Sequence, residues 1–202
     1  MRINPYVPFS SKILEVIPHT EKEYTFRMEF EGEVKPGQFF EVSIPKFGEA
    51  PISVSGISPK SIDLTIRRVG RVTDEVFENY AGDTLFLRGP YGNGFDVNKY
   101  TDGECLVVAG GTGVSPVRGV IDALSESKDA KDKHIILGFK SPSDMLFRED
   151  IARWEKSMDL ILTMDKEAEG YSGNVGLVTK FIPEVKLNNV ETTQAVVVGP
   201  PQ

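Results

Sequence analysis

The chain has 202 residues, enough for one large domain or two small ones with a buried core. Apolar residues make up 40% and charged residues 26%, and the formal net charge of −7 argues against nucleic acid, because phosphate binding requires clustered Lys and Arg. No apolar run is long enough to span a membrane and the first residues lack a signal-peptide core, so we expect a cytoplasmic protein without membrane insertion.

Short apolar runs separated by Gly and Pro fill the first half of the chain. They predict strands at residues 12–17, 24–30, 38–44, 52–54, 62–69 and 84–87, with one short helix at 73–80. Strands of this number and spacing are typical of a small antiparallel barrel. We therefore predict a six-stranded antiparallel β-barrel domain over residues 1–98.

From about residue 104 the pattern changes to strands that alternate with helices. Strands are predicted at 106–109, 134–139, 160–164 and 195–198, and helices near 116–125, 144–156 and 176–182. This alternation predicts a parallel α/β sheet with right-handed crossovers over residues 99–202. We expect the last strand to lie at an exposed edge of that sheet.

A glycine-rich turn follows the first strand of the second half. Gly110, Gly111 and Gly113 come directly after an apolar run, Ser115 is the predicted helix cap, and Pro116 suits the first helical position. Backbone N–H groups at such a turn attract anions, and glycines let a pyrophosphate approach them. The alternative is a tight turn that merely joins a strand to a helix. The flanking strand and capped helix favour a dinucleotide phosphate site.

Metal and hydrolytic chemistry has little support. Cys105 is the only cysteine, and one thiol cannot build a disulfide, a zinc site or a Cys-ligated iron–sulfur cluster within one chain. We interpret it as a small core residue. His19 and His134 are not a ligand pair by spacing, and no nucleophile elbow is present, so neither needs a catalytic role.

Four segments, in this order, resemble the ferredoxin–NADP reductase superfamily over the whole chain. They are Pro51-Ile52-Ser53-Val54, Thr65-Ile66-Arg67 with Gly70-Arg71-Val72-Thr73, residues 110–116, and Gly199-Pro200-Pro201. Within the superfamily the chain resembles the electron-transfer subunits, first the anaerobic sulfite reductase B subunit, then those of dihydroorotate dehydrogenase and hydrogenase. The resemblance implies FAD on the barrel and NAD(P)H on the α/β domain.

The resemblance also assigns residues. It implies FAD contacts at Pro51, Ile52, Ser53, Val54, Thr65, Ile66, Arg67, Gly70, Val72 and Thr73, and nicotinamide dinucleotide contacts at Gly110, Gly111, Thr112, Gly113, Pro116, Gly199 and Pro200. Ser53 and Thr112 are the candidates nearest the chemistry, beside the flavin ring and the nicotinamide. Two alternatives stay open: Thr112 as a turn residue bonded to its own backbone, and Arg67 as part of a solvated strand face.

The chain departs from the family pattern in three places, one of which is Val198, where many relatives carry a cysteine near the hydride-transfer site. Ala50 stands where relatives usually carry an arginine that contacts the FAD phosphate, so we expect Arg67 or Arg71 to supply that charge. Relatives continue beyond the position of Gln202 with a helix, a strand and a cysteine-rich [2Fe–2S] tail. We therefore expect an incomplete α/β domain and no metal, in either a shortened protein or one that lacks this module.

The resemblance implies an NAD(P)H-dependent flavin oxidoreductase that serves as an electron-transfer subunit. Electrons would pass from NAD(P)H through FAD to a catalytic partner subunit, with sulfite reductase as the first expectation and dihydroorotate dehydrogenase or hydrogenase as alternatives. A redox-inactive nucleotide-binding or docking module is the alternative of another class. After the second parallel strand, Lys140 offers a positive charge to a 2′-phosphate, whereas the Asp144 carboxylate would repel it. The choice between NADH and NADPH therefore stays open, and we weakly favour NADH.

Overall fold

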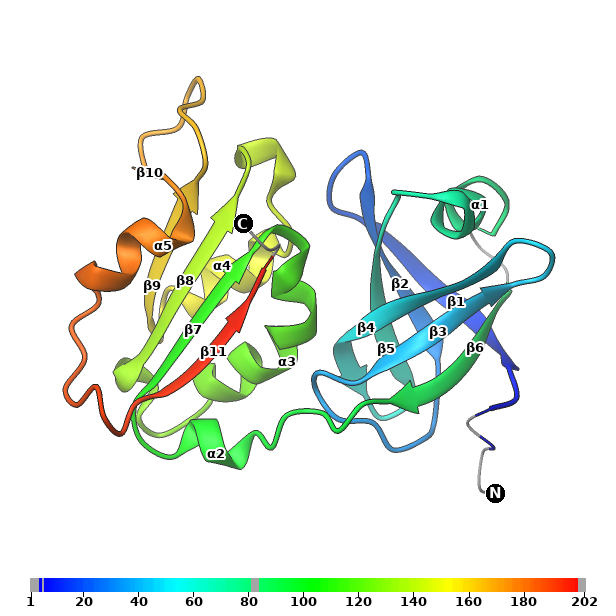
Figure 1. Cartoon of the computed structure of the whole chain (residues 1–202), viewed down its shortest axis with the longest axis horizontal. Coiled ribbons are helices and arrows are strands. Elements are labelled where there is room, and N and C mark those ends of the chain that lie inside the picture. Colours follow the sequence, from blue (N-terminus) through cyan, green and yellow to red (C-terminus); the bar gives the residue numbers. More distant parts are fainter. Residues whose placement is uncertain (1–3, 5, 81–83, 200–202) are drawn as a thin grey trace. The chain divides into compact units, whose positions relative to one another are not determined.

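The computed structural model describes Asn4, residues 6–80 and residues 84–199. The chain divides into two compact units, Met1–Phe95 and Asp96–Gln202, and each contains its own sheet (Figure 1). Within the described ranges no helix combines the length and the apolarity needed to cross a membrane. The same ranges hold no cluster of three or more His, Cys, Asp or Glu side chains able to bind a metal ion.

Unit 1 is a closed barrel of antiparallel strands, which confirms the predicted architecture. The strands are β1 Phe9–Pro18, β2 Glu23–Glu29, β3 Phe39–Ile44, β4 Gly48–Ser58, β5 Ser61–Arg67 and β6 Thr84–Tyr91. Their order around the barrel is β1-β2-β5-β4-β3-β6, and β6 pairs with β1 to close it. Closure removes the free strand edges that an open sheet would expose.

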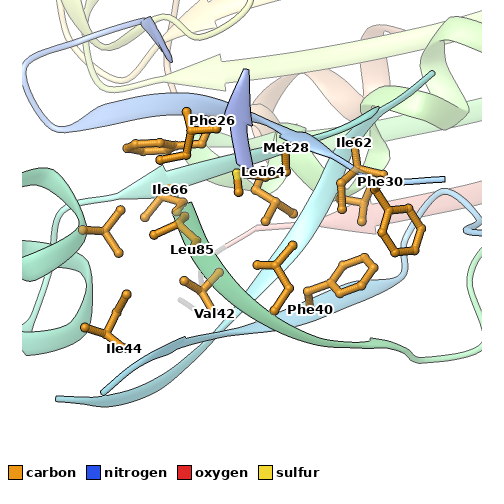
Figure 2. Packing of buried hydrophobic residues seen from close by; sticks show 14 residues of the cluster. Phe26, Met28, Phe30, Phe40, Val42, Ile44, Ile62, Leu64, Ile66 and Leu85 are labelled. Carbon is orange, nitrogen blue, oxygen red and sulfur yellow. The ribbon is translucent and has the colours of Figure 1, made fainter. Parts of the chain in front are cut away.

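Alternation along the strands builds the barrel core. Ile62, Leu64 and Ile66 on β5 are at most 1% exposed, and Phe26 and Met28 on β2 are fully buried. Figure 2 shows these side chains converging on one another inside the barrel. Since neighbours on a strand face opposite sides, the residues between them point away from the barrel core.

Strand β4 is longer than its apolar pattern predicted. It extends over Gly48–Ser58, because its polar and small residues pair with β3 on one side and with β5 on the other. Helix α1, Arg71–Asn79, follows β5 and begins two residues before the predicted helix. Its Val76 side chain packs into the barrel core, which fixes the helix against the barrel.

Unit 2 is a parallel α/β sheet, as predicted. Strands β7 Cys105–Gly110, β8 Lys133–Phe139, β9 Asp159–Met164, β10 Asn174–Val175 and β11 Gln194–Val198 lie in the order β10-β9-β8-β7-β11. The helices are α2 Asn98–Thr101, α3 Val114–Ser125, α4 Arg148–Trp154 and α5 Val178–Phe181. Leu106, Val108 and Ile136 pack against Phe181 of α5. On the described chain β11 forms one edge, with Val197 70% exposed.

One predicted helix of unit 2 is broken. Residues 142–144 form a separate 3-10 turn, and α4 begins only at Arg148. Phe147 has a φ of 53°, in the left-handed region, which a right-handed helix cannot include. Strand β10 and helix α2 were not predicted, because two and four residues are too short to give a periodic pattern.

Candidate cofactor-binding segments

The first candidate segment lies on β4, and its side chains alternate between the core and the exterior. Val54 is 2% exposed and Ile52 packs against the barrel core. Pro51 is exposed and Ser53 is partly exposed. The Ser53 hydroxyl makes no hydrogen bond to any described residue, so it is available to a ligand. Of this segment, Pro51 and Ser53 therefore offer side chains outside the barrel.

The second segment begins on β5. Ile66 is fully buried in the barrel core, so its side chain cannot touch a ligand outside. The Thr65 hydroxyl lies 2.7 Å from that of Thr25 on β2 and 2.7 Å from that of Ser55 on β4. Thr65 thus belongs to a row of hydroxyls across three strands, which the sequence analysis did not detect. The signal was present, because Thr25 and Thr65 are outward positions on neighbouring strands.

Arg67 already has an acidic partner. Its Nε lies 3.1 Å from Oε1 of Glu23, the residue opposite it on β2, although the angle does not make a directed hydrogen bond. The Arg67 side chain is 40% exposed, and an ion pair of this kind contributes only about 0–1 kcal/mol. Arg67 is therefore not simply solvated, and its guanidinium is already paired with a carboxylate. To bind a phosphate it would have to share or leave Glu23.

The turn before α1 is held by one hydroxyl. Thr73 Oγ1 accepts hydrogen bonds from the N–H groups of Val69 (3.0 Å) and Gly70 (3.1 Å), and donates to the Gly70 carbonyl (3.0 Å). These bonds use the full capacity of a hydroxyl, so Thr73 shapes the turn without binding a ligand through its side chain. Val72 packs against the barrel core.

Open space lies at the N-terminus of α1. A Cβ added at Gly70 would meet nothing within 4 Å, and Gly70 itself supplies no capping side chain. The N–H groups of the first helical turn therefore remain for an outside acceptor. Arg71 is exposed beside this space, where its guanidinium donates to the Lys46 carbonyl (3.0 Å) and lies over the Phe47 ring (5.4 Å). No carboxylate of the described chain pairs with Arg71.

In unit 2 the glycine loop joins β7 to α3, and different physical constraints require glycine at its positions. Gly111 has a φ of +55° and open space around its Cβ position, so its backbone conformation requires glycine. A Cβ at Gly113 would lie 2.7 Å from the Val198 carbonyl oxygen, so that glycine is needed for packing against the end of β11. A Cβ at Gly199 would lie 3.7 Å from the Gly110 nitrogen.

Two motifs that are far apart in the sequence therefore meet at the carboxyl edge of the sheet. Ala109 and Val198 are partners in the β7–β11 ladder, which brings residues 110–113 beside Gly199. The predicted contact at Pro200 lies outside the described residues. Ligands of parallel α/β sheets bind at this edge.

Helix α3 begins two residues earlier than predicted. Ser115 and Pro116 are its second and third residues, so Ser115 does not cap the helix. Instead the Ser115 hydroxyl is buried, 4% exposed, without a hydrogen-bond partner in the described chain. The Thr112 hydroxyl makes no hydrogen bond to a described residue either, so the alternative of a turn threonine whose side chain bonds its own backbone is not seen. An unpartnered buried hydroxyl at an uncapped helix N-terminus fits an absent acceptor such as a phosphate.

A carboxylate marks the carboxyl end of β8. Ser141 Oγ donates to Asp144 Oδ2 (2.5 Å), and the Asp144 N–H donates to the Ser141 carbonyl (3.0 Å). Lys140 is exposed beside them. A carboxylate after the second strand of a nucleotide-binding sheet accepts ribose hydroxyls and repels a 2′-phosphate.

The most strongly shifted acid lies at the opposite edge of the sheet. Burial raises the pKa of Glu104, but hydrogen bonds from Thr193, Asn188 and Asn189 outweigh this effect and lower it to about 2. Glu104 directly precedes β7 and holds the loop that leads to β11, so its role is structural. Cys105 is fully buried, and burial raises the pKa of its thiol to about 11.

Known proteins share both the sequence and the fold. The family described as "Oxidoreductase NAD-binding domain" matches residues 107–202. Sulfhydrogenase 2 subunit gamma of Pyrococcus furiosus is 34% identical over 98% of this chain and 76% of its own length. A probable dihydroorotate dehydrogenase B (NAD(+)) electron transfer subunit of Thermoplasma volcanium is 31% identical, over 95% of this chain and 68% of its own length. The ferredoxin reductase in carbazole 1,9a-dioxygenase superimposes with a TM-score of 0.80 at 21% identity, covering 96% of this chain and 62% of that one.

Proposed function

Because this chain belongs to the ferredoxin reductase-like family of oxidoreductases, we propose that it is an NAD(P)H-dependent flavin oxidoreductase that acts as an electron-transfer subunit. The observation that carries the proposal is the meeting of residues 110–113 with Gly199 beside an uncapped helix and the unpartnered Ser115 hydroxyl. Such a site suits the phosphates of a dinucleotide. The barrel of unit 1 offers separate segments for a second cofactor.

FAD fits the open positions of unit 1. Pro51 and Ser53 would lie beside the flavin ring, where the free Ser53 hydroxyl supplies a polar contact. The first turn of α1 would receive the phosphates at Gly70, and Arg71 would supply the positive charge that Ala50 lacks. When bound, FAD supplies the chemistry of accepting two electrons and passing them on singly. The protein holds and orients the cofactor and needs no general acid or base.

NADH is the proposed electron donor. Residues 110–113 and Ser115 would bind its phosphates, Thr112 would lie toward the nicotinamide, and Asp144 would accept its ribose hydroxyls. The curated name of the Thermoplasma relative also includes NAD(+).

For the partner, the relatives favour a different enzyme from the first expectation. They are gamma subunits of sulfhydrogenase and electron-transfer subunits of dihydroorotate dehydrogenase, and a sulfite reductase partner has no support among them. We therefore propose a catalytic partner subunit of the hydrogenase or dihydroorotate dehydrogenase type.

A flavin titration tests the proposal. The purified chain, incubated with FAD and desalted, should retain the absorption bands of bound flavin, and NADH should bleach them without oxygen. Ser53→Ala should weaken FAD binding, whereas Ser58→Ala, an exposed serine farther along the same strand, should not. Failure to bind FAD or FMN would favour the redox-inactive docking module, and binding of FMN alone would contradict the assignment of the α1 turn.

A further inference from the structure

A row of hydrogen-bonded side chains crosses the barrel wall on the side away from the core, and two of its members, Thr25 and Ser55, are buried. His19 Nε2 lies 2.7 Å from Thr25 Oγ1, which lies 2.7 Å from Thr65 Oγ1. Thr65 Oγ1 lies 2.7 Å from Ser55 Oγ, and Ser55 Oγ donates to the Asp63 carbonyl at 3.1 Å. The row thus links the turn between β1 and β2 with β5 and β4.

The Asp63 carbonyl, which ends the row, decides which side chain of each hydrogen-bonded pair is the donor. A carbonyl oxygen only accepts, so the 3.1 Å contact with Asp63 is a hydrogen bond when Ser55 gives its single proton to it, and in that arrangement Ser55 accepts from Thr65. By the same rule Thr65 accepts from Thr25, and Thr25 accepts from His19. In this arrangement His19 carries a proton on Nε2.

We propose that His19 is a positioning residue for the flavin site, acting through Thr25 on Thr65. With this direction fixed, the Thr65 hydroxyl has no proton left to donate and one acceptor position free. It can therefore accept a hydrogen bond from a ligand N–H, such as one on a flavin ring, but cannot donate. The inference rests on the proposed function, because Thr65 belongs to the segment proposed to hold FAD.

The turn that carries His19 is itself attached to the end of β5. The Arg68 N–H donates to the Lys22 carbonyl at 2.7 Å, and Glu23 pairs with Arg67. The His19 N–H also donates to the Glu23 carbonyl at 2.9 Å, which closes the turn. His19 is therefore held in a fixed position relative to Thr65.

The direction of the row is measured without flavin. The chain has two histidines, so long-range ¹H–¹⁵N spectra with His19→Gln for assignment identify the His19 signals. We expect the Nε2–H tautomer when His19 is neutral, and a weaker preference in Thr65→Val, which keeps the side-chain shape without the hydroxyl. The Nδ1–H tautomer in the unsubstituted protein would overturn the proposed direction.

The flavin role is measured by FAD affinity. His19→Ala should weaken FAD binding about threefold to tenfold, as for loss of one hydrogen bond, and His19→Gln, which retains an N–H donor, should stay within about twofold. Glu21→Gln is the matched control, because Glu21 is exposed on the same turn and its side chain takes no part in the row. Thermal unfolding of each variant identifies any loss of folding. FAD affinity is then compared between Thr65→Ser, which keeps the hydroxyl, and Thr65→Val, which removes it.

The outcomes separate the two proposals. Unchanged FAD affinity in both His19→Ala and Thr65→Val overturns the role of His19 while leaving the flavin function intact. Absence of FAD binding by the unsubstituted protein overturns the proposed function and the flavin role of His19 together. The tautomer measurement then still decides the direction of the row.

Discussion

Replacing Gly113 by alanine separates a packing requirement from a backbone requirement. Gly113 has a φ of −62° and a ψ of −15°, which alanine adopts freely, so the conformation itself adds no strain. The new Cβ would lie 2.7 Å from the Val198 carbonyl oxygen and 3.3 Å from the Gly199 Cα. Both contacts are backbone, so no side chain can rotate away and the end of β11 must shift.

The expected loss is that of an overpacked site, about 1–3 kcal/mol of unfolding free energy. For a unit near 100 residues each kcal/mol lowers Tm by about 4–8 °C, which calorimetry or circular dichroism measures readily. Because the displaced atoms belong to Val198 and Gly199, NADH binding should weaken as well.

Gly111 is the matched comparison. Its Cβ position is open but its φ is +55°, so Gly111→Ala should be destabilised by about 1–2 kcal/mol through conformation alone. Gly111→Asn should recover part of that loss, because Asn tolerates the left-handed region, whereas Gly113→Asn should recover nothing. Wild-type stability of Gly113→Ala would refute the packing argument.

Three further predictions concern charge. The pKa of Glu104 is lowered to about 2 by folding, so its contribution to stability should be present above its ordinary pKa near 4.5 and lost as pH falls toward 2. In Glu104→Gln the loss of stability between about pH 4.5 and pH 2 should be smaller, and an unchanged dependence of stability on pH would contradict this role of the Glu104 carboxylate. Arg71→Ala should weaken FAD binding by about 1.5–3 kcal/mol if its phosphate contact forms, and by more than Arg67→Ala, since Arg67 is already paired with Glu23; calorimetric titration compares them. Asp144→Ala should reduce the preference for NADH over NADPH in stopped-flow reduction of the flavin, and a preference that persists would place the selection elsewhere.

The architecture was predictable because it depends on patterns that lie within one segment. Alternating apolar residues on β2 and β5 indicate a barrel wall, and the apolar run before Gly110 indicates a buried parallel strand. Contacts between segments were not predictable in this way. The pairing of Arg67 with Glu23 depends on the register of β2 against β5, which no single segment reveals.

The hydrogen bonds of individual site residues also depended on the conformation of the adjoining turns. Ser115 was expected to cap α3, but the helix follows directly on the 3-10 turn at Gly111–Gly113 and begins two residues early, and the Ser115 hydroxyl is buried. Thr73 was expected to contact FAD, and the three backbone hydrogen bonds of its hydroxyl hold the turn itself.

The alternation within the β4 and β5 segments limits how their binding properties can be redesigned. Ile52, Val54 and Ile66 belong to or pack on the barrel core, so changing them alters folding before it alters recognition. The outward positions at Pro51, Ser53 and Thr65 can vary without a new core. A library intended to shift cofactor preference should therefore randomise alternate residues only, because randomising the whole motif would discard most variants as misfolded protein.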